Sequence, residues 1–349
     1  MIDKLLHDRC LPEILNGKPW PERRAELLTL FQDQIYGYTP AAPGQVTGKI
    51  VHVTDPAYAH KAMDEEIELT WDTPNGPFTL PIRFIYPRTG TPCPAFVLIN
   101  FRPDSPDRYW PVEELVDNGY AVARVYYNDV TDDSAKMDGL AAMYPAEGNH
   151  AWGKIGMWAF ACSRVLDYLL TRPEIVDPTR VAVTGHSRLG KTALWAGAQD
   201  ERFALAISND SGCSGAAITR DKVGETVRDI TRNFPYWFCP AYLQYIDNEH
   251  AMPFDQHELV ALMAPRRVYV ASAEEDTWAD PTSEYLSCCA ASAAYEALGM
   301  KGFVHPDSLP EMNQPLHEGE IGYHVRTGSH FFSRTDWLFH MAYRKKHNV

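Results

Sequence analysis

The sequence predicts an α/β protein, a three-layer α/β/α sandwich built around a mostly parallel central sheet. Two observations lead to this class. The segments 93–101 (CPAFVLINF) and 119–127 (GYAVARVYY) are nearly continuous apolar runs, as expected for strands that are buried on both faces. Helical patterns such as 152–173 separate these runs from later ones, and strands that alternate with helices favour a parallel sheet covered on both sides.

The elements can be placed in order along the chain. Residues 21–37 predict a helix, with Pro21 near its start and Gly37 at its end. Alternating, β-branched stretches then predict antiparallel strands at 44–54, 65–71 and 80–87. Further strands are expected at 93–101, 119–127, 180–185, 203–210, 266–276 and 321–326, and helices at 152–173 (amphipathic), 189–200, 281–299 and 335–346. No repeat or linker interrupts this order, so we expect a single domain, 1–349, with the helix and antiparallel strands of roughly 1–90 packed on it.

Composition and charge exclude several classes of protein. The 349 residues carry a formal net charge of -14, which argues against a nucleic-acid-binding surface. No apolar run reaches the length of a membrane span, and the first residues lack the apolar core of a signal peptide, so the chain as given is expected to stay in the cytoplasm. The seven cysteines form no C-x-x-C motif, and the histidines show no ligand spacing. We therefore expect no metal and no cofactor.

The segment RVAVTGHSRLGKT (180–192) supports two incompatible interpretations. Gly185, Gly190, Lys191 and Thr192 match G-x-x-x-x-G-K-[ST], the pattern of a phosphate-binding P-loop. The same residues also predict a strand, a sharp turn holding Ser187 and then a helix, which is the layout of a nucleophile elbow in a serine hydrolase. The generic elbow motif G-x-S-x-G is not met, because the second glycine comes one residue late.

The order of the other candidate residues favours the elbow. Ser187 follows one buried strand, Asp210 ends the next and Asp276 ends the one after that, while His330 follows the last strand. This is the Ser…Asp…His order of α/β-hydrolases, and each residue stands at the carboxyl end of a strand, where open α/β sheets place their sites. Asp210 and Asp276 both remain candidates for the acid; the usual fold geometry places the loop of Asp276 beside the histidine loop.

The sequence that surrounds Ser187 carries a more specific signal than the short motif does. GHSRLGKTALWAGAQDERFALAISNDSGCSGAAITR (185–220) resembles the nucleophile region of glucuronoyl esterases, a carbohydrate esterase family, in its bacterial branch, where G-x-S-R-x-G-K replaces G-x-S-x-G. Similarity continues in RAELLTLFQDQIYGYTP, GYAVARVYYNDVTDD, GETVRDITRNFPYWF, AEEDTWADP and GYHVRTGSH, which together span about residues 20 to 345. The resemblance implies an α/β-hydrolase fold.

The resemblance also implies roles for individual residues. Ser187 would be the nucleophile and His330 its base, while the backbone N–H and the side chain of Arg188 would stabilise the oxyanion. Lys191, Glu225 and Trp278 match positions that contact the sugar in the family. Family members are often secreted or periplasmic.

The sequence departs from the family at two places. His186 and Ser329 stand where the fungal branch carries a disulfide, so that cross-link is absent. The glycine-rich segment that relatives often have after the first buried strand is replaced by NFRPDSPDRYW (100–110). The resemblance therefore does not define this wall of the site.

The expected activity is hydrolysis of esters of glucuronic or 4-O-methylglucuronic acid, as in lignin–glucuronoxylan cross-links, through an acyl-enzyme. The expected partner is a saccharide that carries such a uronate ester. An acetyl (xylan) esterase with the same triad is the main alternative, and a P-loop nucleotide binder or a non-catalytic sugar-binding relative are the others.

Overall fold

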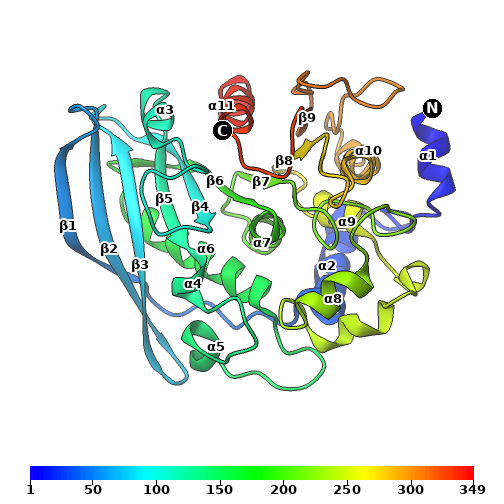
Figure 1. The fold of residues 1–349 in the computed structure, drawn as a ribbon, viewed down its shortest axis with the longest axis horizontal. Helices are drawn as coiled ribbons and strands as arrows, with labels where there is room; N and C mark the ends of the chain where they lie inside the picture. Colours follow the sequence, from blue (N-terminus) through cyan, green and yellow to red (C-terminus); the bar gives the residue numbers. More distant parts are fainter.

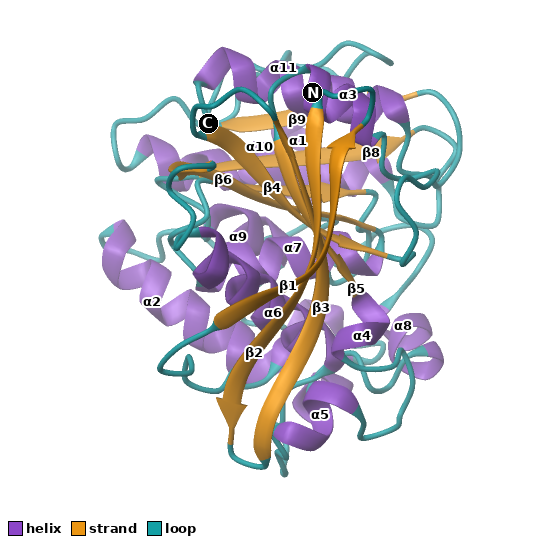
Figure 2. Cartoon of the chain, turned by 90° about the vertical axis from the view of Figure 1, so that its left-hand side faces the viewer, coloured by secondary structure: helices purple, strands orange, loops and turns teal.

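A single nine-stranded sheet runs through the protein, and the computed structural model describes all residues, 1–349. The strand order is β1-β2-β3-β5-β4-β6-β7-β8-β9. Strands β1 to β3 pair antiparallel with one another, β3 pairs antiparallel with β5, and all pairs from β5 to β9 are parallel. The mostly parallel sheet predicted from the sequence is confirmed, with the antiparallel strands forming one wing of it (Figures 1 and 2).

The strands are β1 (Thr47–Ala57), β2 (Ala62–Thr73), β3 (Gly76–Pro87), β4 (Cys93–Asn100), β5 (Ala121–Tyr126), β6 (Val176–His186), β7 (Leu205–Asn209), β8 (Arg267–Ala273) and β9 (Ile321–Arg326). The helices are α1 (Ile2–Asp8), α2 (Trp20–Phe31), α3 (Val112–Asp117), α4 (Tyr127–Val130), α5 (Gly139–Met143), α6 (Lys154–Leu169), α7 (Arg188–Gln199), α8 (Val227–Asn233), α9 (Gln256–Ala261), α10 (Pro281–Glu296) and α11 (Arg334–His347). A π-helical turn, η1 (Gln32–Tyr36), and two 3-10 turns, η2 (Pro240–Tyr245) and η3 (Glu249–Ala251), complete the chain.

Helices cover both faces of the sheet and give the sandwich two apolar layers. The larger core cluster holds 79 buried residues and includes side chains from α2, α6, α7, α9 and α10. The smaller cluster, of 20 residues, lies on the other face beneath α3 and α11. Figure 1 shows α3 and α11 on one side of the strands and α6 and α7 on the other. The parallel strands carry apolar side chains on both faces because both faces are covered.

Two predicted helices differ in detail from the structure. The helix predicted at 21–37 is an α-helix only to Phe31 and continues as the π-helical turn η1, which ends at Gly37 with a φ of 81°. The helix predicted as amphipathic at 152–173 is α6, and it lies deeper than the pattern alone indicates, since every residue except Asp167 is buried. It is enclosed because α7, α4 and α5 pack around it while it also contacts β4. None of the helices has the length and apolar character needed to cross a bilayer.

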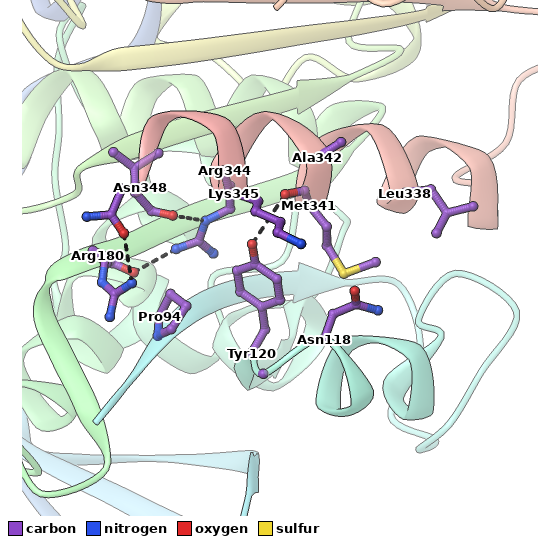
Figure 3. A pocket seen from close by; sticks show the side chains of 12 residues that line it. Pro94, Asn118, Tyr120, Arg180, Leu338, Met341, Ala342, Arg344, Lys345 and Asn348 are labelled. Carbon is purple, nitrogen blue, oxygen red and sulfur yellow. Dashed lines mark hydrogen bonds between the residues drawn. The ribbon is translucent and has the colours of Figure 1, made fainter. Parts of the chain in front are cut away.

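Hydrogen bonds join the C-terminal helix α11 to residues near the amino ends of the strands (Figure 3). The Arg344 guanidinium donates to the backbone oxygens of Ala95 (3.0 Å) and Arg180 (2.6 Å) and lies 4.2 Å from the ring centroid of Phe96. The Tyr120 hydroxyl donates to the backbone oxygen of Met341. A cavity of about 470 Å³ opens here, at the end of the sheet opposite to the catalytic candidates.

Candidate active site

The predicted nucleophile stands alone between a strand and a helix. Strand β6 ends at His186, α7 begins at Arg188, and Ser187 joins them with a φ of 59° and a ψ of -127°. A non-glycine residue with positive φ is strained, and this strain is the mark of a nucleophile elbow. A Cβ added to Gly185 would lie 2.2 Å from the backbone oxygen of Leu189, so only glycine fits two residues before the serine.

The displaced second glycine has a packing role of its own. A Cβ on Gly190 would lie 3.1 Å from the backbone oxygen of Asn209 and 3.1 Å from the Cβ of Ser211. The glycine therefore lets the first turn of α7 approach the end of β7 closely. In the same turn the Ser187 N–H donates to the backbone oxygen of Asn209 at 2.8 Å.

The lysine of the P-loop pattern is also engaged within the protein. The Lys191 ammonium is buried and donates to the backbone oxygen of Ser211. Burial lowers its pKa, while the nearby Glu225 carboxylate acts in the opposite direction. A P-loop needs backbone N–H groups and a lysine that are free for phosphate. Here the Ser187 N–H already has a protein acceptor, which argues against the nucleotide-binding hypothesis, whereas the Lys191 ammonium uses only one of its three donors.

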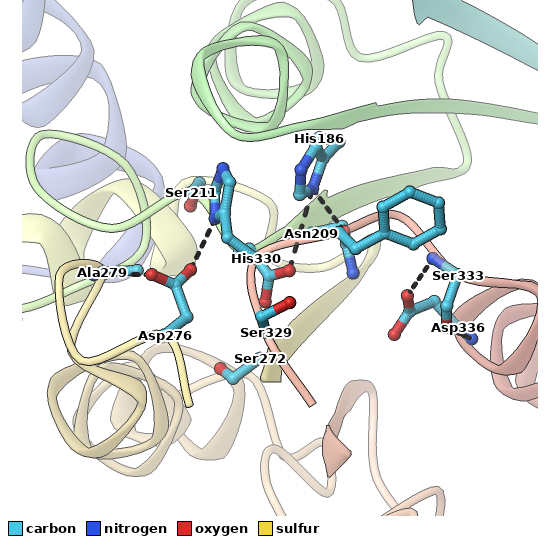
Figure 4. A network of polar contacts seen from close by, with 12 residues as sticks. His186, Asn209, Ser211, Ser272, Asp276, Ala279, Ser329, His330, Ser333 and Asp336 are labelled. Atoms are coloured by element: carbon cyan, nitrogen blue, oxygen red, sulfur yellow. Dashed lines mark hydrogen bonds and ion pairs between the residues drawn. The ribbon is translucent and has the colours of Figure 1, made fainter. Parts of the chain in front are cut away.

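The structure pairs His330 with Asp276. The Nδ1 atom of His330, in the loop after β9, lies 2.6 Å from a carboxylate oxygen of Asp276, in the loop after β8 (Figure 4). The other oxygen of Asp276 accepts the Ala279 N–H at 3.2 Å. Burial raises the pKa of Asp276, but the contact with His330 outweighs burial and holds this pKa below its usual value. The carboxylate is thus charged and placed to stabilise a protonated imidazole.

Asp210, the other candidate acid, lies near His330 but makes no hydrogen bond with it. Its carboxylate is buried and lies 3.5 Å from the Arg326 guanidinium and 3.8 Å from Nδ1 of His186, and its second oxygen has no partner. Burial, helped by the charges of Asp336 and Glu284, raises its pKa well above the usual value. The geometry therefore favours Asp276 over Asp210 as the residue that orients His330.

One arginine, Arg326, anchors the loop that carries His330 through hydrogen bonds to the loop backbone. Arg326, the last residue of β9, donates to the backbone oxygens of Thr327 and Ser329, both at 3.2 Å, and to that of Phe331. Its Nε contacts the Asp336 carboxylate of α11 at 2.9 Å and 3.0 Å. Nothing in the sequence pattern singled out Arg326 or Asp336, because their role depends on contacts between β9 and α11.

Arg188 is fixed beside Ser187 by an acidic and aromatic frame. Its guanidinium forms an ion pair with Asp133 and lies 4.7 Å from the Trp237 ring centroid and 5.4 Å from that of Phe101. The Trp237 indole N–H donates to the other oxygen of Asp133 at 2.7 Å. Asp133 ends a segment that resembles the family, but no spacing pointed to this role. These contacts hold the Arg188 guanidinium in a defined position in the cavity that Ser187 also lines.

All eight residues named from the sequence line one cavity of about 340 Å³. They are Ser187, Arg188, Lys191, Asp210, Glu225, Asp276, Trp278 and His330. Two aromatic rings, Phe234 and Trp237, which stack with their centroids 3.8 Å apart, complete the wall. The Glu225 N–H donates to the backbone oxygen of Trp278 at 3.0 Å, so the loops that carry these two side chains support each other. The Trp278 side chain itself is 53% exposed and stands at the rim.

His186, Asp210 and His330 place one ligand atom each within 4.8 Å of one another. Each of these groups already has a protein partner: His186 Nδ1 lies 2.6 Å from the Asn209 side-chain oxygen, Asp210 faces Arg326, and His330 faces Asp276. Burial lowers the pKa of His186 to about 3, so this ring is neutral. The cluster is explained without an ion, and the absence of a metal stays a prediction.

The chain is similar to known carbohydrate esterases. The family model described as "Glucuronyl esterase, fungi" matches residues 73–299. Carbohydrate esterase MZ0003, from an unknown prokaryotic organism, is 46% identical over 68% of this chain and 56% of its own length. The 4-O-methyl-glucuronoyl methylesterase 1 of Sodiomyces alcalophilus is 37% identical over 53% of this chain and 39% of its own length. The chain thus aligns with about half the length of these relatives.

A solved structure resembles the whole chain. The structure of a promiscuous CE15 esterase from a marine bacterial metagenome superposes with a TM-score of 0.88 at 34% identity, and the match covers 97% of this chain and 96% of that one. The nucleophile elbow and the Asp276 loop lie inside the segment that matches the family model, whereas His330 lies beyond it. The fold, the elbow and these similarities together show that the chain belongs to the glucuronyl esterase family.

Proposed function

We propose that this protein is a serine esterase that hydrolyses esters of glucuronic or 4-O-methylglucuronic acid through an acyl-enzyme. One observation carries the proposal: a single cavity holds both a Ser187–His330–Asp276 constellation and polar side chains suited to a sugar. Ser187 attacks the ester carbonyl while His330 takes its proton and then delivers it to the leaving alcohol. Water, activated by the same imidazole, then releases the uronic acid.

Negative charge develops on the ester carbonyl oxygen during both steps, and we assign its stabilisation to Arg188. As the first residue of α7, Arg188 has a backbone N–H without an intrahelical acceptor, and its guanidinium is held by Asp133. Donors that are already aligned cost no reorganisation during the reaction, and losing one such donor typically slows the reaction about 10²–10³-fold. The positive end of α7 adds to this stabilisation.

The sugar part of the ester is assigned to the side of the cavity that holds Lys191, Glu225 and Trp278. A buried ammonium and a buried carboxylate can donate to and accept from vicinal hydroxyls, and the Trp278 ring offers an apolar face to the C–H groups of a pyranose. Similarity to the 4-O-methyl-glucuronoyl methylesterase 1 of Sodiomyces alcalophilus supports the choice of a uronate ester.

An acetyl esterase with the same triad is the second candidate, because the similar marine esterase is described as promiscuous. Comparing kcat/KM for benzyl glucuronate with that for p-nitrophenyl acetate separates the two. We expect the uronate ester to be preferred and Ser187→Ala to abolish turnover of both. Turnover of the acetate with no turnover of the uronate ester would overturn the proposed substrate. Absence of activity on both would instead favour a non-catalytic sugar-binding protein.

A further inference from the structure

A second cavity, of about 520 Å³, adjoins the catalytic residues from the other side. It shares Ser187, Arg188 and His330 with the cavity that holds the sugar-binding candidates. Its remaining wall comes mainly from the segment after β4 and includes Arg102 and Arg108. The cleft therefore continues past the nucleophile to a wall formed by this segment.

This second cavity lies where the alcohol part of an ester would sit. If Lys191, Glu225 and Trp278 hold the acyl sugar, the alcohol must project away from them across Ser187. The alcohol also has to lie within reach of His330, which protonates it as it leaves. The second cavity meets both conditions, because Ser187 and His330 belong to its wall as well.

The charges of this wall are not balanced. No carboxylate lies within 4.0 Å of the guanidinium of Arg102 or of Arg108, whereas the third arginine of the cavity, Arg188, is paired with Asp133. Arg108 is exposed and Arg102 is half-buried. Neither guanidinium is neutralised by an ion pair, although the protein as a whole carries a net charge of -14.

One acidic residue, Asp104, also lines the cavity, but a buried cation lies near it. Burial lowers the pKa of Arg124, which has no ion pair of its own, and Asp104 is one of the carboxylates whose charges act against this effect. Arg124 also donates to the backbone oxygen of Pro103 at 2.6 Å, next to Asp104. With Arg188 paired to Asp133, Arg102 and Arg108 face the single carboxylate of Asp104, so the wall still carries a net positive charge.

The arginine at position 108 rests on aromatic rings. Its guanidinium lies 4.9 Å from the ring centroid of Tyr109 and 5.9 Å from that of Phe331, and it uses one donor on the Tyr109 hydroxyl at 3.2 Å. The two rings are 4.9 Å apart. A guanidinium stacked in this way keeps most of its donors free and can bind a carboxylate through two parallel hydrogen bonds.

We propose that this cavity binds the alcohol part of the substrate and selects alcohols that carry a carboxylate. The inference rests on the proposed function and extends it to the leaving group. Hydrolysis stays balanced as for any ester: water adds across the acyl–oxygen bond, the uronic acid is released, and the alcohol leaves with a proton from His330 and its own carboxylate unchanged. Arg102 and Arg108 would select the leaving group, and neither takes part in the bond changes.

The test compares three esters of glucuronic acid: benzyl, 4-carboxybenzyl and 4-carbamoylbenzyl. The carbamoyl ester matches the carboxylate in size but is neutral. We expect kcat/KM for the carboxylate ester to exceed that for the carbamoyl ester by about tenfold, the effect of one ion pair in a partly solvated site. This ratio should fall toward one in Arg108→Gln and in Arg102→Gln, and 0.5 M NaCl should reduce it in the parent enzyme.

Lys49→Gln is the matched control, because it removes one positive charge from exposed strand β1, far from the cavity, and should leave the ratio unchanged. A ratio of one or below in the parent enzyme, with the benzyl ester still hydrolysed, would overturn this inference and leave the proposed function intact. A ratio that is equally high in both arginine variants would overturn it too. Failure to hydrolyse any of the three esters would instead refute the proposed function, and the inference with it.

Discussion

Replacing Asp276 by asparagine is the most direct test of the catalytic assignment. Asparagine keeps the size of the side chain and removes its charge. In the transition state His330 becomes a cation whose Nδ1 lies 2.6 Å from the Asp276 carboxylate. Two unit charges about 4 Å apart interact by about 4 kcal/mol at an effective dielectric constant of about 20. Since about 1.4 kcal/mol corresponds to one power of ten in rate, kcat should fall about 10³-fold.

The loss could be larger because asparagine can also favour the wrong tautomer of the imidazole, and the equivalent change in serine proteases costs about 10⁴-fold. The matched control is Asp210→Asn. Asp276, and not Asp210, is hydrogen-bonded to His330, so kcat of Asp210→Asn should stay within about tenfold of the parent. The assay is kcat on benzyl glucuronate, with a thermal melt of each variant to establish that it is folded.

Two results would refute this reasoning. One is a fall in kcat for Asp210→Asn that equals or exceeds the fall for Asp276→Asn in folded protein. The other is an Asp276→Asn enzyme that retains a tenth or more of the parent kcat. Either result would mean that the 2.6 Å contact between His330 and Asp276 does not support the charge on the imidazole.

The other predictions concern packing, pH and substrate recognition. Gly185→Ala should abolish activity and lower the melting temperature, because its Cβ would lie 2.2 Å from the backbone oxygen of Leu189; Gly190→Ala, with a nearest contact of 3.1 Å, should be clearly milder in the same melts and assays. Burial lowers the pKa of His340 well below 6.5, so the folded state holds this ring neutral while the unfolded state binds a proton as the pH falls below about 6.5. Stability is therefore lost on acidification, by up to about 1.4 kcal/mol per pH unit, and His340→Leu should flatten the pH dependence of urea unfolding between pH 6.5 and 5; an unchanged slope would contradict this. His340→Leu should also raise the free energy of unfolding at pH 8 by about 1 kcal/mol, because both ring nitrogens are buried without partners. Lys191→Met should lower kcat/KM for benzyl glucuronate much more than for p-nitrophenyl acetate, and equal losses on the two esters would argue against a sugar-binding role.

Most of the fold could be predicted from the periodicity of apolar residues. The buried strands β4 to β9 contain short apolar runs, and the helices α6, α7 and α10 between them are long enough to recognise. The short helices α3, α4, α5, α8 and α9 were not predicted, because each spans no more than two turns. The amphipathic pattern of α6 did not indicate how deeply this helix is enclosed. That helix contains Lys154 and Arg164, and each charge finds a partner inside the protein: Lys154 donates to the backbone oxygen of Lys136, and Arg164 pairs with Asp167 at 2.8 Å. A charged residue in a sequence therefore does not by itself mark an exposed face.

The site was predictable to the extent that its residues stand at the ends of strands. Asp210 and Asp276 follow neighbouring strands, so the sequence alone left both as candidate acids. Which of them faces His330 depends on loop conformation: Asp210 has a φ of 45°, and its carboxylate contacts Arg326. Asp133 was not found because it acts through Arg188, which is distant from it in sequence.

The contacts of Arg326 allow substitutions on α11 to affect activity, and a mutational scan of this protein should be interpreted with this in mind. The carboxylate of Asp336 that binds Arg326 also accepts the Ser333 N–H at 2.6 Å and so caps α11. The position of the His330 imidazole therefore depends on how the C-terminal helix α11 packs against the end of β9. Substitutions on α11 that never approach a substrate can still register as inactive in a high-throughput activity screen. Such positions would be mistaken for binding determinants unless protein abundance is scored alongside turnover.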